Sequence, residues 1–187
     1  MNKPKLIIIT GMPGAGKSTL SKKLGAQVCM PVISRDEIKE GYVHTLGVPS
    51  KELLNDSNEE ATEIYFAVLK QLIQDGVSLI AEAAFQHELW LKNLGWFIER
   101  ADVSIVICTV EEKVAHERFL KRGLSDHRRE YFHSDYGVEQ YRKGEKVEFS
   151  HYNEPKIDVE TIHVDTTEKY SPSLKELSAM LSLIPHH

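Results

Sequence analysis

Residues 11–19 read GMPGAGKST and follow directly behind the apolar run LIII at residues 6–9. Residues 11–18 match G-x-x-x-x-G-K-[ST] at every fixed position, a pattern typical of a phosphate-binding loop between a strand and a helix. Glycines let such a loop turn its N–H groups inward around phosphate oxygens, and the next helix points its positive end at the same anion. An accidental glycine turn is the alternative, which the strand–loop–helix context disfavours. The predicted nucleotide site comprises Gly11, Met12, Pro13, Gly14, Ala15, Gly16, Lys17, Ser18 and Thr19.

Two polar side chains of this loop indicate the cofactors. Lys17 is expected to bring a full positive charge to the β- and γ-phosphates and so to act in catalysis. Ser18 is expected to offer its hydroxyl to a magnesium ion that bridges those phosphates. We therefore expect ATP and Mg²⁺ as cofactors. The pattern predicts that a nucleotide binds, but it does not say what is done with it.

The composition limits the class of protein. The 187 residues suffice for one domain with a hydrophobic core, and a net charge of −5 argues against a surface built wholly to hold nucleic acid, although a local basic patch stays open. No apolar stretch approaches the ~20 residues of a membrane span, and no signal-cleavage pattern follows the first strand, so we expect a cytoplasmic protein without a membrane partner. Cys29 and Cys108 are expected to be reduced, buried thiols.

Apolar runs and helical periodicities alternate along the chain. Strands are expected at residues 5–10, 28–34, 77–81, 103–110 and 161–164, and helices at residues 17–24, 88–100, 111–122 and 173–183. A helical turn is expected to start at residues 36–40, and residues 51–74 are expected to form one long helix or two short ones. Gly25 and Gly123 are interpreted as helix stops, and residues 41–50 as a loop. The buried side of the helix at 88–100 is expected to carry Leu91, Leu94 and Ile98.

This alternation predicts an α/β fold in which a parallel sheet has helices on both faces and ligands bind at the carboxyl ends of the strands. We expect a single domain over residues 1–187. Residues 41–61 are expected to form an insert that covers the acceptor, and residues 123–151, rich in Arg, His, Asp and Tyr, a lid.

Four sequence blocks, in order, carry a resemblance to a known group. They are GMPGAGKST, ISRDEIK at residues 33–39, GVSLIAEAAF at residues 76–85 and ERFLKRG at residues 117–123. Together they resemble the small P-loop kinases related to polynucleotide 5′-hydroxyl kinase, gluconate kinase and the zeta toxins, over roughly residues 5 to 170. The resemblance implies a three-layer P-loop NTPase fold with a five-stranded parallel sheet and an arginine-rich lid. It also implies transfer of the γ-phosphoryl group of ATP to a hydroxyl.

The resemblance implies roles for three residues at strand ends. Asp36 would be the general base for the acceptor hydroxyl, unless it only caps the helix that follows. Arg35 would bind an anionic part of the substrate or only solvate the surface. Glu82 would hold a magnesium-bound water or a substrate hydroxyl, unless it is a carboxylate paired with a basic neighbour. The family more often has aspartate there, with threonine two positions on, so the sequence EAA at residues 82–84 hints at a different acceptor.

Four arginines follow the fourth expected strand. Arg118 and Arg122 are four residues apart and share a helical face, and Arg128 and Arg129 follow. Cations that close over phosphates when substrate binds belong on a mobile lid, so we expect Arg122 and Arg118 to contact ATP, with Arg122 catalytic. Arg128 and Arg129 are candidates for the substrate. A solvated basic face is the alternative for each arginine alone.

The acceptor itself stays open at this stage. The acidic net charge favours a hydroxyl of a small molecule over a nucleic-acid 5′ end. A further alternative is a regulatory or toxin-like module that binds nucleotide with little turnover. His133 is one of several residues in segments that could border the acceptor, and the histidines show no ligand spacing that predicts zinc.

Overall fold

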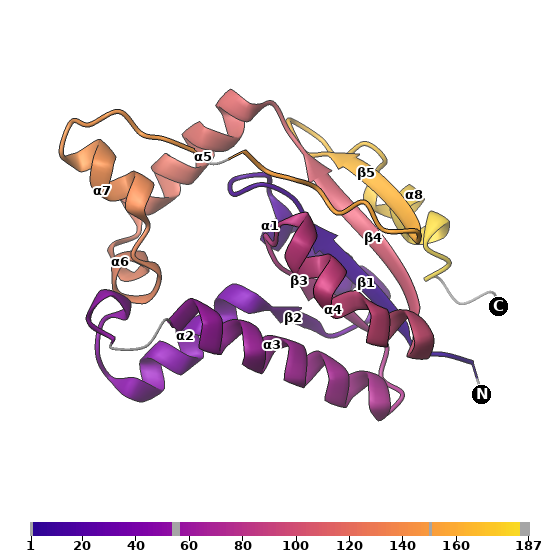
Figure 1. The fold of residues 1–187 in the computed structure, drawn as a ribbon. Helices are drawn as coiled ribbons and strands as arrows, with labels where there is room; N and C mark the ends of the chain where they lie inside the picture. Colours follow the sequence, from indigo (N-terminus) through magenta and orange to yellow (C-terminus); the bar gives the residue numbers. More distant parts are fainter. Residues whose placement is uncertain (1, 54–56, 150, 184–187) are drawn as a thin grey trace.

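The computed structural model describes residues 2–53, 57–149 and 151–183. Its five strands form one parallel sheet in the order β2-β3-β1-β4-β5 (Figure 1). The strands are β1 Lys5–Thr10, β2 Val32–Ser34, β3 Leu79–Glu82, β4 Asp102–Thr109 and β5 Glu160–Asp165. The predicted α/β fold with a parallel sheet is confirmed, and β3 lies beside β1 in that sheet.

Helices cover both faces of this sheet. They are α1 Lys17–Val28, α2 Arg35–Leu46, the 3₁₀ turn η1 Ser50–Glu52, α3 Ser57–Gln74, α4 His87–Arg100, α5 Glu112–Ser125, α6 His127–His133, α7 Tyr136–Arg142 and α8 Leu174–Met180. Helices α1 and α8 pack on one face, and α3 and α4 on the other. Helices α5, α6 and α7 extend beyond the carboxyl edge of the sheet, where α6 lies against α2 and η1 (Figure 1).

The central strand is buried on both sides. Leu6 and Ile8 of β1 face the α3 and α4 side, whereas Ile7 and Ile9 face α1 and α8. This two-sided burial explains why β1 reads as a continuous apolar run. A rigid β1 fixes the point at which the glycine loop begins.

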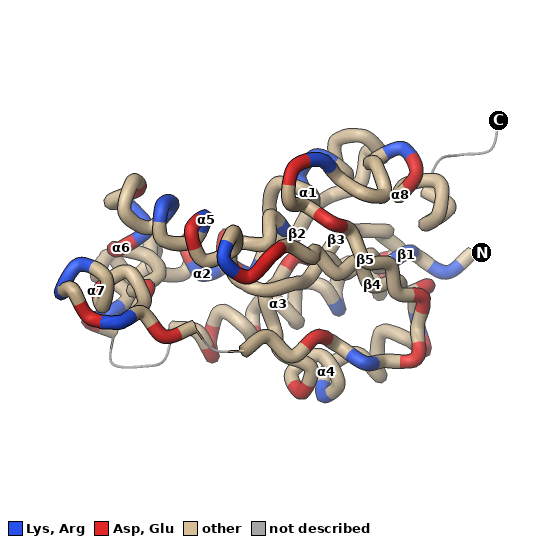
Figure 2. The backbone as a smooth tube through the Cα atoms, turned by 90° about the horizontal axis from the view of Figure 1, so that it is seen from above, with Lys and Arg blue, Asp and Glu red and all other residues tan. Residues whose placement is uncertain are grey.

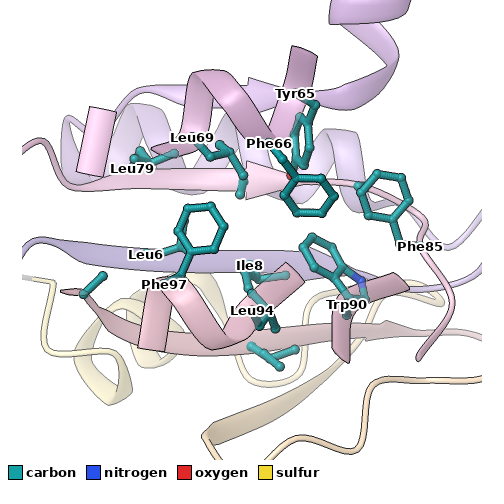
Figure 3. Packing of buried hydrophobic residues seen from close by; sticks show 14 of the residues in the cluster. Leu6, Ile8, Tyr65, Phe66, Leu69, Leu79, Phe85, Trp90, Leu94 and Phe97 are labelled. Atoms are coloured by element: carbon teal, nitrogen blue, oxygen red, sulfur yellow. The ribbon is translucent and has the colours of Figure 1, made fainter. Parts of the chain in front are cut away.

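An aromatic cluster fills the core between the sheet and helices α3 and α4 (Figure 3). The ring of Phe85 lies 5.6 Å from the ring of Phe66 and 5.1 Å from that of Trp90. The Trp90 Nε1–H group donates to Thr10 Oγ1 at 3.2 Å, inside the core. The same hydroxyl shares a hydrogen bond of 2.9 Å with Tyr152 Oη, from the irregular segment between α7 and β5. The cluster therefore holds the last residue before the glycine loop.

Two predicted helix stops are wrong. Gly25 lies inside α1, where an added Cβ would lie 3.0 Å from the Met30 carbonyl oxygen, and α1 ends instead at Cys29 in a left-handed conformation (φ 53°). Gly123 lies inside α5, where a Cβ would collide with Val138. Both glycines serve close packing rather than termination. Likewise α2 continues through Gly41 to Leu46, so the predicted loop is shorter than expected.

Two burial predictions also differ from the structure. The buried side of α4 consists of Trp90, Leu94 and Phe97, whereas Leu91 is 57% exposed. The larger aromatic rings bury more apolar surface, so they take the core side of a helix whose apolar residues surround much of its circumference. Cys108 is buried as predicted, but Cys29 is exposed because it ends α1.

No helix in the described part of the chain is both long and apolar enough to cross a membrane. Basic and acidic residues are interspersed along the described backbone (Figure 2).

Candidate active site

The glycine loop is held open by its own backbone and by its neighbours. Gly11, Gly14 and Gly16 adopt φ values of 142°, 84° and 81°, which side-chain-bearing residues rarely adopt. A Cβ on Gly11 would lie 2.6 Å from the Cys108 carbonyl oxygen. Thr166, just after β5, donates its hydroxyl to the Ala15 carbonyl at 2.8 Å. The ends of β4 and β5 therefore fix the shape of the loop.

Lys17 points along this loop. Its ammonium group donates to the Met12 carbonyl oxygen at 2.9 Å, and the residue is only 7% exposed. Burial lowers the pKa of Lys17, and the negative charges of Glu82 and Asp36 partly offset that effect. A buried cation near two carboxylates suits a site that receives polyphosphate.

A cavity of about 360 Å³ joins the loop to the elements that surround it. The glycine loop forms one wall, and α2, the end of β3, α5 and α6 form the others. The predicted residues that line this cavity are Pro13, Gly14, Gly16, Lys17, Ser18, Thr19, Arg35, Asp36, Glu82, Arg118, Arg122 and Arg129. Residues from both halves of the chain thus meet in one space.

Asp36 lies in the first turn of α2 and faces this cavity. It does not cap the helix, because the N-cap residue is Ser34. Burial favours the protonated acid, but the charges of His133, Arg35 and Arg129 outweigh it and lower the pKa of Asp36 below its ordinary value. The carboxylate is therefore ionised at neutral pH and can accept a hydrogen bond from a hydroxyl.

Glu82 ends β3 opposite Ser34 of β2 in the register of the sheet. It is 4% exposed, and the Ser34 hydroxyl donates to Glu82 Oε2 at 2.7 Å, which explains why Ser34 gives α2 no side-chain cap. Burial raises the pKa of Glu82, while Lys17 and the Ser34 hydroxyl oppose that rise. The basic neighbour of Glu82 is Lys17, whose charge acts on the carboxylate from nearby, while the hydrogen bond to Glu82 comes from Ser34.

Ser18 and Glu82 are the residues that fit a magnesium ion here. Both line the cavity beside Lys17, and both offer the hard oxygen atoms that Mg²⁺ prefers. The described residues contain no cluster of three or more His, Cys, Asp or Glu side chains arranged around a metal position. Mg²⁺ usually keeps several waters and is held through phosphates and one or two protein ligands, so this donor set fits a nucleotide-bound ion.

Three of the four candidate arginines, Arg118, Arg122 and Arg129, line the cavity, whereas Arg128 does not. Arg122 lines the cavity and is exposed as a whole residue, and partial desolvation of its guanidinium together with the nearby Arg129 lowers its pKa. Arg118 donates to the Thr166 carbonyl at 3.1 Å and so joins α5 to the end of β5. Arg128 points away from the cavity, with a side chain that is 87% exposed and bonded to Asp126 at 3.1 Å.

A second hollow, of about 470 Å³, adjoins the first beyond Arg118. It lies between the start of α1 and the segment after β5, and Thr19, Lys23 and Tyr170 line it. The Lys23 ammonium lies 5.2 Å from the centre of the Tyr170 ring. The two hollows share Gly16, Thr19 and Arg118.

Sequence reasoning missed three polar residues that line the first cavity, namely Lys39, Asn58 and Asp135, and it named His133 only as one of several residues that could border the acceptor. Lys39 lies four residues after Arg35, and His133 four after Arg129, so helical spacing could have linked each pair. Asn58 and Asp135 carried no such signal. Asn55, in the segment expected to cover the acceptor, lies outside the described residues.

Comparisons with known proteins identify a family and several similar folds. The model of a family described as AAA domain matches residues 6–139. A UPF0200 protein of Sulfurisphaera tokodaii is 31% identical over 124 residues, which cover 65% of this chain and 68% of that protein.

Two solved structures are similar over nearly their whole length. A presumed kinase of Chloroflexus aurantiacus has a TM-score of 0.76 at 24% identity and covers 99% of this chain and 100% of its own. The APS kinase of Mycobacterium tuberculosis, solved with AMPPNP and APS, has a TM-score of 0.62 at 16% identity. The match covers 97% of this chain and 99% of the APS kinase chain. These likenesses confirm, at the level of fold, the resemblance to small P-loop kinases.

Proposed function

This chain belongs to the AAA domain family, and on that premise we propose that it is an ATP- and Mg²⁺-dependent kinase that phosphorylates a hydroxyl of a small molecule. One observation carries the proposal. The glycine loop, a buried carboxylate at the end of β3, the ionised Asp36 and the arginines of α5 all line a single cavity. This set meets the needs of phosphoryl transfer, which depends mainly on positioning and on neutralising charge.

The nucleotide is expected to span both hollows. Its triphosphate would lie on the N–H groups of the glycine loop, and its base in the second hollow between Arg118 and Tyr170. Lys17 would exchange the Met12 carbonyl for phosphate oxygens. Ser18 and, through water, Glu82 would hold Mg²⁺, which when bound neutralises charge on the β- and γ-phosphates.

Asp36 is expected to orient the acceptor hydroxyl toward the γ-phosphorus and to accept its proton late in the reaction. Its lowered pKa makes it a weak base in the empty site, which is compatible with a loose transition state that needs little early proton removal. Arg122 would stabilise charge on the transferring group. Because Arg122 lies in α5 directly before the segment predicted to act as a lid, closure of α5 and α6 would bring it onto the phosphates.

A small acceptor fits the site better than a nucleic-acid end. The cavity must hold the triphosphate and the acceptor together in about 360 Å³, and α6 packs on α2 and η1 at its outer end.

The test uses γ-labelled ATP, Mg²⁺ and a panel of sugars, sugar acids, nucleosides, aminocyclitols and 5′-hydroxyl oligonucleotides. We expect one class of small acceptor to take up label, and Asp36→Asn to lower transfer by a factor of about 100 or more while ATP still binds. Glu37→Gln is the matched control, because Glu37 lies on the same turn of α2 but pairs with Lys22 at the surface. Equal transfer by Asp36→Asn and wild type would remove Asp36 from its role, and tight ATP binding without any labelled acceptor would contradict the kinase proposal.

A further inference from the structure

We propose that the acceptor carries an anionic group besides its reacting hydroxyl, and that Arg35 and Arg129 bind this group at the end of the cavity formed by α2 and α6. The shared chemistry is that of a carboxylate, sulfate or phosphate. The inference rests on the proposed kinase function and narrows its substrate class from alcohols to hydroxylated anions.

The charge of the cavity wall is the first observation. The chain as a whole has 28 acidic against 23 basic residues, yet the wall carries six basic residues against three carboxylates. The basic residues are Lys17, Arg35, Lys39, Arg118, Arg122 and Arg129, and the carboxylates are Asp36, Glu82 and Asp135. A triphosphate on the glycine loop accounts for the cations beside that loop and on α5. The cations of α2 and α6 lie beyond it, so they indicate a second anion.

Arg35 is held in a way that keeps its charge available. Its side chain is 13% exposed, and Nη2 donates to the carbonyl and the side-chain oxygen of Asn58 at 2.9 and 3.0 Å. Its Nε contacts Thr62 Oγ1 at 3.4 Å. These neutral acceptors orient the guanidinium without cancelling its charge. Arg35 also forms an ion pair with Asp36, whose carboxylate lies 3.6 Å from Nη1, a distance too long for a hydrogen bond.

Arg129 faces the same end of the cavity from α6. Its side chain is also 13% exposed, and its Nε donates to Asp135 at 3.1 Å. That bond fixes the guanidinium in the wall and leaves the two Nη groups as the fork that a ligand oxyanion would meet. His133 bonds to Glu40 of α2 at 2.7 Å, which ties α6 to α2. The two arginines are therefore presented from two helices that are linked to each other.

Asp36 gives this arrangement a chemical consequence. The charges of His133, Arg35 and Arg129 lower its pKa in the empty cavity. An anion between Arg35 and Arg129 would offset part of this positive field and so raise the pKa of Asp36 toward that of a useful base. An anionic substrate would thereby make Asp36 a stronger base for its own hydroxyl, whereas water or a neutral alcohol would not.

A purely structural reading of Arg35 makes a different prediction. On that reading the guanidinium only joins α2 to α3 through Asn58 and Thr62. Loss of Arg35 would then destabilise the fold and would weaken all acceptors alike. The proposal instead requires a loss confined to acceptors that carry an anion.

The experiment compares matched probes on the full chain saturated with Mg²⁺ and AMPPNP, so that the glycine loop is already filled. Glycerol, glycerate and glycerol 3-phosphate are each titrated by calorimetry, with inorganic sulfate as a probe without a hydroxyl. We expect glycerate, glycerol 3-phosphate and sulfate to bind, and glycerol to bind at least about tenfold more weakly, since a hydrogen bond to a charged group contributes roughly that factor. Arg35→Gln and Arg129→Gln should each weaken the anionic probes by about tenfold or more and leave AMPPNP binding unchanged.

Arg128→Gln is the matched control, because Arg128 is a neighbouring arginine that points to solvent. Thermal melting of each variant separates lost binding from lost folding, and Arg35→Lys should restore part of the affinity. The inference is overturned if the anionic probes bind no better than glycerol, or if Arg35→Gln and Arg128→Gln have equal effects. If AMPPNP itself fails to bind, the kinase proposal fails first and this inference with it. If AMPPNP binds and neutral alcohols accept phosphate as well as anionic ones, only this inference fails.

Discussion

At the scale of single residues, Glu82 is a buried carboxylate that lowers the stability of the folded chain. Its carboxylate is 4% exposed and receives a hydrogen bond from Ser34, yet its pKa is raised by burial. The folded chain therefore binds a proton at Glu82 more readily than the unfolded chain does. It follows that the ionised carboxylate lowers stability above the folded-state pKa, and that this penalty fades as the pH falls toward the ordinary value of 4.5.

Glu82→Gln should therefore melt at a higher temperature than wild type at neutral pH, and the difference should shrink on acidification. The same variant should need more Mg²⁺ for phosphoryl transfer, because a neutral amide is a poorer partner for magnesium-bound water. Melting curves over a pH series and a magnesium titration of activity test both effects. Glu37→Gln, at an exposed surface pair, is the control and should show neither. A Glu82→Gln protein that melts below wild type at neutral pH would contradict the account.

The glycine loop could be recognised from the sequence, because its residues lie in one unbroken run, and six of the nine predicted residues line the cavity. The sequence also indicated Asp36 and Glu82, which follow recognisable strands. Asn58 and Asp135 were not predictable, since each reaches the cavity only because α3 and the segment after α6 fold back onto α2 and α5. The sequence did not distinguish Arg128 from Arg129. The two are adjacent on α6, yet Arg129 lines the cavity and Arg128 extends into solvent.

At the scale of elements, the helical glycines test how the segment beyond β4 is assembled. Gly123 lies where α5 meets α7, and an added Cβ would collide with Val138. Gly95 of α4 has open space where a Cβ would be. The two positions therefore make opposite predictions for the same substitution.

Gly123→Ala should lower the free energy of unfolding by about 1–3 kcal/mol, the usual cost of overpacking. Gly95→Ala should raise it by about 0.5–1 kcal/mol, because alanine favours a helix interior. Urea unfolding of both variants measures these changes. Adding Val138→Ala to Gly123→Ala should restore part of the loss. A stable Gly123→Ala protein would mean that α5 and α7 do not pack as described.

The existence of the strands and the order of strands and helices along the chain could be predicted from the sequence, because the apolar runs are long and are separated by helical patterns. Helix boundaries could not. The sequence does not distinguish a glycine that ends a helix from one that makes room for a neighbouring side chain. Gly25 and Gly123 make room for neighbours. The buried side of α4 was also misjudged, since three apolar residues of suitable spacing compete there with Trp90 and Phe97.

At the scale of the whole molecule, an acidic chain encloses a basic cavity. The excess of negative charge lies outside the site, while the walls around Asp36 are rich in arginine and lysine. This arrangement favours a compact anion that enters the cavity over a polymer that lies across the surface.

Acceptor affinity should therefore depend weakly on salt. Between about 50 and 200 mM salt we expect a loss of less than about tenfold, whereas a polynucleotide with 6–10 phosphate contacts would lose roughly 10³–10⁵. Initial rates at several salt concentrations, with ATP kept saturating, give this slope for whichever acceptor takes up label. A steep slope would favour a nucleic-acid 5′ end as the acceptor and would contradict the small-molecule assignment.

The most direct test of the central claim, that the glycine loop and Lys17 grip polyphosphate, is a calorimetric titration of AMPPNP with Mg²⁺ into wild type and Lys17→Met. We expect one nucleotide per chain for wild type and an affinity at least about tenfold lower for the variant. Melting curves of both proteins separate lost binding from lost folding. Absence of heat with wild type, or equal affinity in both proteins, would contradict the account.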